Sequence, residues 1–365
     1  MPEKSLRFGG CGCHISVTRA NPTRRRFLAT AASIAGAALG RPAWAQDRPV
    51  ASSQASDAQR IDIHHHLAPP RYIPELTSRK TNQRPLTEWT PQKSLDVMGR
   101  AGISTSMVSI SEPGVWFGDD AEARRIARET NDWGAALVRD YPGRFGLFAS
   151  LPIPDVDASL REIEYSLDVL KADGICMMTS YGGKYLGDPS FQPIMAELHR
   201  RKAVVFTHPV RANCCRNLVP DVGDNTIELA TDTARTIASL LVSGTVTRFP
   251  EIRFIFSHGG GTLPSLTGRI VAQVSASAEV KQRLPNGPIA ELRKMFYDTA
   301  NASNPWALAP LLKLVSTSQI LYGSDFPFRS PEENAKGLRE IGFSASELLA
   351  IDRENALRLL PRLKA

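Results

Sequence analysis

The sequence has few cysteines, no long uncharged run and no nucleotide-binding loop. Five cysteines among 365 residues are too few for a disulfide-stabilised scaffold of this size. No uncharged stretch approaches the roughly 20 residues that a membrane-spanning helix needs. The first expected strand is not followed by a G-x-G-x-x-G motif, and there is no Walker-type lysine loop, so nucleotide binding has no support. What is present is an ordinary globular composition, 42% hydrophobic and 22% charged, which excludes wholesale disorder and a fibrous fold.

An excess of positive charge is confined to the amino-terminal segment. The chain has 44 basic and 37 acidic side chains, a formal net charge of +7. Residues 1–45 hold seven of the basic side chains and only one acidic side chain, Glu3. The remaining 320 residues therefore carry 37 basic and 36 acidic side chains, or about +1. A body this close to neutral does not call for a nucleic acid or an anionic membrane surface as a partner.

The amino-terminal segment has the layout of an export signal. Thr23–Leu28 contains three consecutive arginines, and an uncharged, alanine-rich run follows as far as Gly40. Ala43-Trp44-Ala45 then supplies small residues around a cleavage site. This pattern predicts a twin-arginine signal peptide over residues 1–45 and a polar linker over 46–59, with export to the periplasm. An uncut amphipathic anchor and a cytoplasmic location are the alternatives. After removal of the signal we expect no membrane association.

The rest of the chain, residues 60–365, alternates short apolar runs with longer amphipathic segments. The expected strands are 60–66, 105–111, 144–151, 174–179, 203–208, 252–258, 295–299 and 320–325. The expected helices include 121–141, 158–170, 191–201, 227–246 and 305–314. Such alternation predicts parallel βαβ units. Eight units of about 40 residues are typical of a (β/α)8 TIM barrel, in which active sites gather at the carboxyl ends of the strands. An open doubly wound sheet is the rival fold.

Histidines and one aspartate stand at the ends of these strands. Strand alternation places His64 and His66 on one face, where two imidazoles can bind one metal ion, and turns His65 to the other face. His208, His258 and Asp325 end three later strands. The interval from His64 to His208 fits four barrel units. The interval from His208 to His258 fits one unit, and that from His258 to Asp325 fits two. The ends of strands one, five, six and eight would therefore converge at one mouth of a closed barrel.

With D-x-H-x-H, the strand-five histidine, H-G-G-G and S-D-F-P, the sequence resembles the amidohydrolase superfamily. Within it the sequence is most similar to the amidohydrolase-related, metal-dependent decarboxylases of the aminocarboxymuconate-semialdehyde and 6-methylsalicylate type. The resemblance implies a (β/α)8 barrel in which His64, His66, His208 and Asp325 bind one divalent metal ion, with Zn²⁺ expected and Mn²⁺ as the other candidate. A single metal is implied because 174–179 contains no lysine. His258 would act as an acid/base group near the metal, and either His258 or Asp325 would supply the proton for decarboxylation.

Further residues are expected to act around these ligands. Asp62 is expected to orient a ligand imidazole. Asp298 either lines the pocket or is a buried, hydrogen-bonded aspartate. Arg211 is a candidate for binding a substrate carboxylate, and Trp116 and Phe117 would stack on an aromatic ring or fill a loop core.

The sequence thus predicts a carboxy-lyase that acts on a small carboxylic acid, either aromatic and ortho-hydroxybenzoate-like or cyclic and unsaturated. A metal-dependent hydrolase of a lactone, ester, amide or C–C bond is the alternative enzyme. A non-catalytic, exported binding barrel is the alternative outside enzymes. Because related barrels are often dimers, the resemblance also suggests a homodimer.

Overall fold

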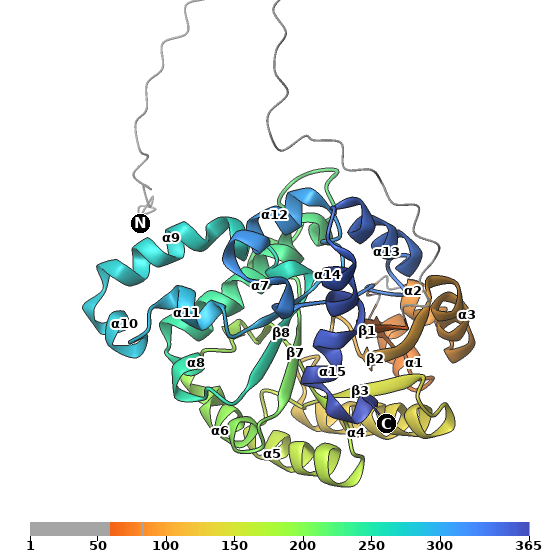
Figure 1. Ribbon diagram of the computed structural model, residues 1–365. Helices are drawn as coiled ribbons and strands as arrows, with labels where there is room; N and C mark the ends of the chain where they lie inside the picture. The colour runs from red at the N-terminus through yellow and green to blue at the C-terminus, as the bar shows by residue number, and fades with distance from the viewer. Residues whose placement is uncertain (1–58, 80, 82–83, 365) are drawn as a thin grey trace, which may run out of the picture. The chain divides into compact units, whose positions relative to one another are not determined.

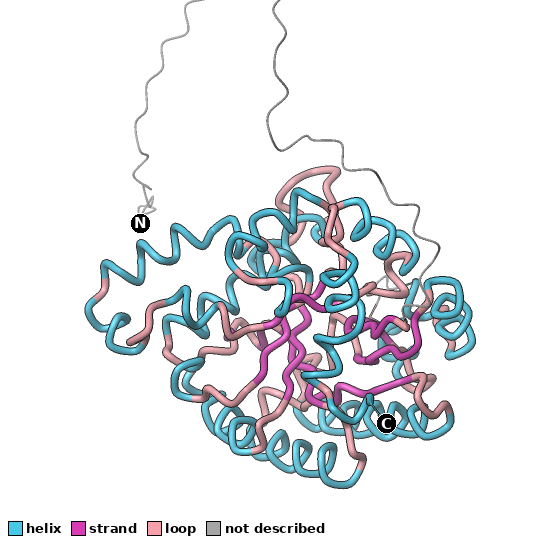
Figure 2. Tube along the Cα trace, viewed as in Figure 1, coloured by secondary structure: helices cyan, strands magenta, loops and turns pink. Residues whose placement is uncertain are grey.

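Eight parallel strands form the centre of the molecule in the computed structural model, which describes residues 59–79, 81 and 84–364. They pair in the order β1-β2-β3-β4-β7-β8-β9-β10, and helices surround them (Figure 1 and Figure 2). The strands are β1 Arg60–His66, β2 Ile103–Ser109, β3 Phe145–Ser150, β4 Gly174–Met178, β7 Val204–His208, β8 Arg253–Phe256, β9 Phe296–Asp298 and β10 Ile320–Leu321. The predicted signal peptide and the linker up to residue 58 lie outside the described residues.

Backbone hydrogen bonds join the first strand to the last and to the segment that follows it. Ile63 N donates to Tyr322 O at 2.9 Å, and His66 N donates to Phe326 O at 2.8 Å. In the other direction, Asp325 N donates to His64 O at 2.8 Å. These bonds pair backbone N–H and C=O groups that an open sheet would leave unpaired at its two edges. The sheet is therefore a barrel, and the open doubly wound alternative is wrong.

Five of the eight larger helices around the barrel begin at a capping side chain. The side chains of Thr90, Asp119, Asp155, Asn304 and Ser330 each accept a hydrogen bond from a backbone N–H in the first turn, which satisfies a donor that the helix itself leaves unpaired. The eight larger helices are α3 Pro91–Ala101, α4 Asp120–Asp140, α5 Val156–Glu164, α6 Gln192–Arg200, α7 Asp224–Val242, α9 Leu263–Ala276, α12 Pro305–Leu314 and α13 Pro331–Glu340.

Shorter elements occupy the connections. A two-stranded hairpin, β5 Ser180–Tyr181 with β6 Lys184–Tyr185, follows β4. The short helices are α1 Tyr72–Ser78, α2 Arg84–Thr87, α8 Thr245–Arg248, α10 Ala278–Arg283, α11 Pro288–Leu292, α14 Ala345–Leu349 and α15 Asn355–Leu359.

The observed bounds differ from the predicted ones at two informative places. The strand expected over 320–325 pairs in the ladder only at Ile320–Leu321, because the chain turns into the active-site mouth and Asp325 adopts a left-handed φ of 64°. The helix expected over 227–246 begins at Asp224 and ends at Val242, because Gly244 takes the left-handed φ of 73° that breaks it.

The core of the barrel contains apolar rings that pack against the buried histidines of β1. Phe148 and Phe206 stack with ring centroids 5.5 Å apart, and the ring of Phe206 meets His64 edge-on at 5.0 Å. Every residue of β1 is buried, including its three histidines. Because burying such polar rings is costly unless they are paired, each must have a bonding partner or a ligand.

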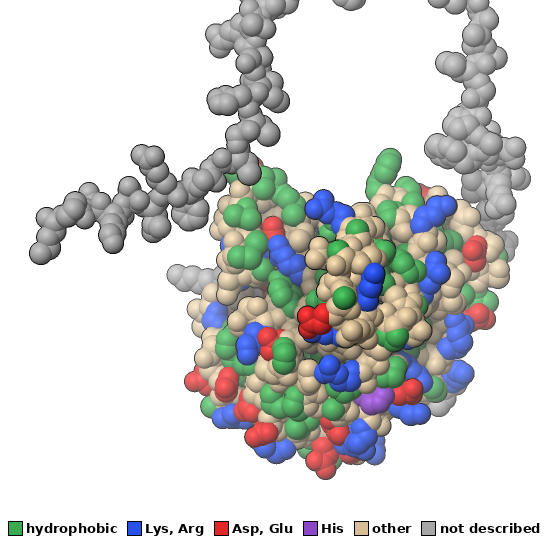
Figure 3. Space-filling view, turned by 90° about the vertical axis from the view of Figure 1, so that its left-hand side faces the viewer, with side chains coloured by type: hydrophobic (Ala, Val, Ile, Leu, Met, Phe, Trp, Pro, Cys, Tyr) green, Lys and Arg blue, Asp and Glu red, His purple; other side chains and the backbone are tan. Residues whose placement is uncertain are grey.

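On the face seen in Figure 3, acidic and basic side chains are interspersed, so this face does not carry charge of one sign only. This mixture agrees with the near-neutral body expected from the sequence. Among the described residues, no helix combines the length and the apolar character that crossing a membrane requires.

Candidate active site

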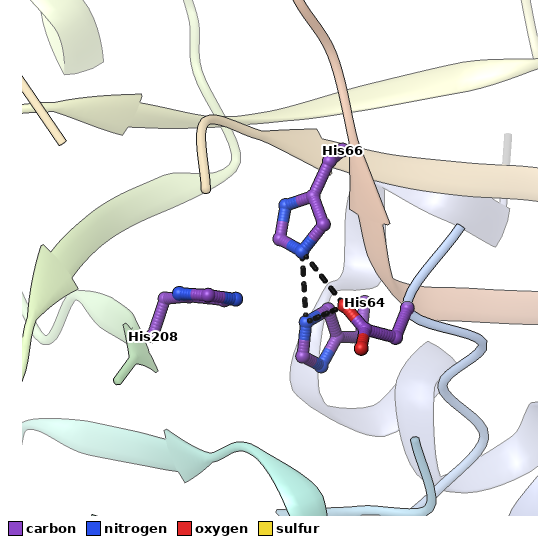
Figure 4. Close-up of side chains that lie close together, drawn as sticks. His64, His66 and His208 are labelled. Carbon is purple, nitrogen blue, oxygen red and sulfur yellow. Dashed lines mark hydrogen bonds and ion pairs between the residues drawn. The ribbon is translucent and has the colours of Figure 1, made fainter. Parts of the chain in front are cut away.

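Four side chains from distant parts of the sequence meet at the carboxyl end of the barrel. His64 and His66 end β1, His208 ends β7, and Asp325 follows β10. One ligand atom from each of the four lies within 4.8 Å of the others, and all four residues are buried. Figure 4 shows the rings of His64, His66 and His208 directed toward one another. The convergence expected from the strand spacing is therefore present in the structure.

Each imidazole of the cluster is held from outside through its Nδ1 atom. His64 Nδ1 donates to Asp298 Oδ2 at 2.8 Å, His66 Nδ1 to the carbonyl of Ser109 at 3.3 Å, and His208 Nδ1 to the carbonyl of Pro209 at 2.9 Å. When the rings are neutral, these bonds fix the tautomer in which Nε2 carries the lone pair. His64 Nε2 and His66 Nε2 lie 3.0 Å apart. Three such nitrogens and one carboxylate are a donor set that fits a divalent metal ion.

The charges in the cluster favour a bound cation. Burial alone would lower the pKa of His64, but the carboxylates of Asp298 and Asp325 outweigh it and raise that pKa to about 10. Burial and the neighbouring His64 lower the pKa of His66 to about 4, despite its hydrogen bond to Asp325. Burial likewise holds the pKa of His208 well below its usual value. The two carboxylates thus favour positive charge at His64, and a bound cation would compete with a proton there.

The structure decides between the alternatives for Asp298 and corrects the expectation for Asp62. Asp298 is fully buried and does not line the pocket. It is the buried, hydrogen-bonded aspartate of the alternative interpretation, and it orients the ligand ring of His64. Asp62 does not bond to a ligand imidazole. Its Oδ2 faces Nδ1 of His65 at 3.0 Å, and its Oδ1 accepts from the backbone N–H groups of His64 and Ser324.

The expectation for Asp62 was wrong because strand alternation does not determine which neighbouring strand supplies a carboxylate. Asp62 instead ties β1 to the segment that carries Asp325. Gly323 permits this close approach, since a Cβ atom there would lie 3.0 Å from the Cβ atoms of both His64 and Asp298.

His258 stands beside the cluster on the side of the cavity. Its backbone N–H donates to Asp298 Oδ1 at 2.9 Å, and its φ of 57° is left-handed. Its Nε2 lies 3.5 Å from Asp325 Oδ2 and has no closer hydrogen-bond partner among the described residues. A buried imidazole nitrogen without a firm partner is available to a substrate.

A cavity of about 710 Å³ borders the cluster at His208 and Asp325. Residues that line it include His208, His258, Asp325, Arg211, Phe328 and Arg329. The size is within the range of small-molecule sites. A ligand in this cavity reaches both the metal cluster and His258.

Arg211 lies on the cavity wall but is bonded to a carboxylate of the protein. Its Nε lies 2.9 Å from both carboxylate oxygens of Glu112, and its backbone N–H also donates to Glu112. Glu112 is itself buried, so it must be paired with a cation or hydrogen-bond donor. No hydrogen bond to another described side chain uses the terminal nitrogens of Arg211, which leaves them for a ligand.

Trp116 and Phe117 do not line this cavity. Trp116 Nε1 donates to Asp120 Oδ1 at 2.9 Å. The guanidinium carbon of Arg79 lies over the ring of Phe117, 4.1 Å from the ring centroid. Both side chains therefore fill loop structure, which was the alternative expectation. The aromatic side chain that does line the cavity is Phe328, whose ring centroid is 5.7 Å from that of His66.

Four residues at the site were not identified from the sequence: Glu112, Asn301, Phe328 and Arg329. All follow the carboxyl ends of strands, which is where a barrel places its functional loops. That positional signal was available in the sequence, but it does not say which residues of a loop turn inward.

Comparison with known proteins decides the family. Residues 61–362 match the sequence profile of the amidohydrolase family. The chain belongs to this family. The match covers the whole barrel, from β1 to the carboxyl-terminal helices, and it includes all the residues of the cluster.

Relatives within the family are decarboxylases. The chain is 37% identical over 323 residues to decarboxylase yanB of Aspergillus niger, a match that covers 83% of this chain and 88% of that protein. It is 34% identical over 320 residues to the 6-methylsalicylic acid decarboxylase of Penicillium expansum, covering 84% and 97%. The family and the enzyme class expected from the sequence, a decarboxylase, are thereby confirmed.

A solved structure has the same fold. It is a 5-carboxyvanillate decarboxylase from Novosphingobium aromaticivorans, in complex with manganese and 4-hydroxy-3-methoxy-5-nitrobenzoic acid. The TM-score is 0.73 at 18% sequence identity, and the match covers 83% of this chain and 96% of that one. At this identity the likeness establishes the barrel fold.

Proposed function

We propose that this decarboxylase removes carbon dioxide from a small aromatic acid of the ortho-hydroxybenzoate type. The observation that carries the proposal is the cluster of three imidazoles and one carboxylate at the floor of a cavity, with His258 beside it. The names of the relatives agree with this substrate class, since one acts on 6-methylsalicylic acid.

A single divalent metal ion is the proposed cofactor, with Zn²⁺ as the first candidate and Mn²⁺ as the second. His64, His66, His208 and Asp325 would hold it. Imidazole and carboxylate ligands suit zinc, and carboxylate also suits manganese, the metal in the related 5-carboxyvanillate decarboxylase structure. When bound, the ion would supply positive charge that orients and polarises the carboxylate and neighbouring hydroxyl of the acid.

Residues of the chain would bind the acid and transfer the proton. The terminal nitrogens of Arg211 would donate to an oxygen of the acid, while Glu112 keeps the guanidinium against the cavity wall. Phe328 would cover the aromatic ring. His258 would deliver a proton to the ring carbon that bears the carboxylate. The C–C bond then breaks, its electron pair returns to the ring, and carbon dioxide leaves.

His258 is preferred over Asp325 as the proton donor. The attraction of His64 and hydrogen bonds from the neighbouring imidazoles overcome burial and hold the pKa of Asp325 well below its usual range, which makes it a ligand and a poor acid. His258, in contrast, lines the cavity, and its Nε2 has no firm hydrogen-bond partner among the described residues.

The proposal is tested by supplying metal-loaded protein with ortho-hydroxybenzoates and, separately, with lactones and esters. Release of carbon dioxide from the benzoates supports it. Consumption of the lactones or esters without carbon dioxide overturns it in favour of the hydrolase. His258→Asn should retain the metal and lose about 10²-fold or more of the rate, the usual contribution of a positioned acid. An unchanged rate would show that His258 is not the proton donor.

We also propose that the chain is exported through the twin-arginine pathway, as the arginines of 24–26 and the small residues before Gln46 indicate. The test is fractionation of a bacterial host that expresses the full chain. A variant in which Arg24 and Arg25 are both lysine should remain in the cytoplasm. Undiminished export of that variant would contradict the proposal.

A further inference from the structure

Asn301, in the loop after β9, reaches the cluster from the cavity side. Its Nδ2 donates to Asp325 Oδ2 at 2.6 Å. The other oxygen, Asp325 Oδ1, lies 3.1 Å from His66 Nε2 and 3.3 Å from His64 Nε2. The two oxygens of the carboxylate therefore have different surroundings, because one faces the imidazoles and the other is held by an amide.

This arrangement gives the carboxylate a fixed rotation about its Cβ–Cγ bond. The nearest alternative partner of Oδ2 is His258 Nε2, at 3.5 Å, which is too long for a strong hydrogen bond. Removing the amide would leave Oδ2 without a short hydrogen bond and allow the carboxylate to turn. We propose that Asn301 is a positioning residue, which presents a single oxygen of Asp325 to the metal and keeps the second oxygen away from it. The inference rests on the metal centre of the proposed function.

The backbone of Asn301 offers a competing explanation. Its φ is 55°, and His258 and Asp325 are also left-handed at 57° and 64°. These three are among seven non-glycine residues with positive φ in the described part of the chain. Asparagine tolerates this conformation better than most residues, so its presence could serve the turn alone. Glycine adopts the same conformation at no cost, which separates the two explanations.

Asn301→Gly removes the amide and keeps the backbone, whereas Asn301→Ala removes the amide and strains the backbone. Asn304→Ala is the matched control in the same loop, because Asn304 caps α12 by accepting from Ala307 N at 3.1 Å and does not touch the cluster. Metal affinity is measured by competition with a chelator, in the absence of substrate. We expect both Asn301 variants to bind the metal at least about 10-fold more weakly, the usual effect of losing a group that orients a ligand. Asn304→Ala should bind it within about twofold of the wild type.

A second measurement separates ligand geometry from general destabilisation. The visible absorption spectrum of the Co²⁺-substituted protein reports the coordination of the ion, and it should change in Asn301→Gly and not in Asn304→Ala. Wild-type affinity and spectrum in Asn301→Gly would overturn the proposal and assign Asn301 to the turn. Wild-type metal affinity and spectrum together with a raised KM would show that Asn301 contacts the substrate instead. Should the glycine variant fail to fold, Asn301→Ala gives the same readouts.

Failure of this inference is distinguishable from failure of the proposed function. Metal that binds with the expected dependence on Asn301, without any release of carbon dioxide, would overturn the decarboxylation and leave the role of Asn301 standing. A wild-type protein that binds no divalent metal would overturn both.

Discussion

At the scale of single residues, the site depends on groups that hold the ligands as much as on the ligands. The histidines were found from the sequence because strand alternation and strand ends limit where a metal site can form. Their partners were not, because the hydrogen bond from His64 to Asp298 joins β1 to β9, which are not adjacent in the sheet, and strand spacing does not specify such a contact. Asp298, and not Asp62, therefore orients a ligand imidazole.

Asp298→Asn is predicted to weaken metal binding by about 10- to 100-fold, because the carboxylate that accepts from His64 Nδ1 also strengthens that ring as a ligand. Metal affinity measured against a chelator checks this. Asp352→Asn is the matched control, since Asp352 is a buried aspartate that pairs with Arg60 at 3.1 Å and not with the cluster. Equal losses of affinity in the two variants would show that the effect is general.

Metal affinity is predicted to rise with pH. Because the carboxylates of Asp298 and Asp325 overcome burial and raise the pKa of His64 to about 10 in the metal-free cluster, a cation must displace a proton throughout the neutral range. Displacing one proton changes the apparent affinity about tenfold per pH unit, so a fall from pH 8 to pH 6 should weaken binding about 100-fold. Chelator competition at several pH values measures the slope, and a flat profile would contradict the displacement.

At the scale of secondary-structure elements, β1, β9 and the segment after β10 must approach unusually closely. The eight strands could be predicted from their apolar runs and spacing, and most of their bounds agree within two residues. The connections could not, because short helices such as α10 and α14 and the hairpin β5–β6 carry little periodic signal. The loops that supply Glu112, Asn301 and Phe328 take their shape from packing against the barrel.

Gly323→Ala tests the close approach of these elements. The added Cβ would sit 3.0 Å from the Cβ atoms of His64 and Asp298, so we expect a loss of about 1–3 kcal/mol in the free energy of unfolding, as for other overpacked sites, and weaker metal binding. Gly268→Ala is the control, because an added Cβ there meets nothing within 4 Å inside α9, and it should be neutral or slightly stabilising. Urea unfolding measures both, and similar results for the two would contradict the packing argument.

At the scale of the whole molecule, the proposed metal site joins the start of the barrel to its end. Its four candidate ligands come from β1, from β7 and from the segment after β10, so only the folded chain brings them together. The single barrel and its family could be read from the sequence because the strand-end motifs span nearly all of it.

Metal is therefore predicted to stabilise the folded state. A ligand present at 100 times its dissociation constant adds about 2.7 kcal/mol when only the native state binds it. Thermal unfolding should shift upward with added metal and return to the metal-free value with a chelator. His64→Ala should show little of this shift, and a wild-type-sized shift in that variant would place the metal elsewhere.

The most direct test of the central claim follows the carboxylate and the proton together. Metal-loaded protein is given an ortho-hydroxybenzoate labelled with ¹³C in its carboxylate, in D₂O, and the products are read by NMR. One labelled carbon dioxide for each acid consumed, with one deuteron on the ring carbon that bore the carboxylate, is the predicted result, and it should disappear in His64→Ala. Consumption of the acid without labelled carbon dioxide, or an undiminished rate in His64→Ala, would contradict the assignment of this barrel as a metal-dependent decarboxylase.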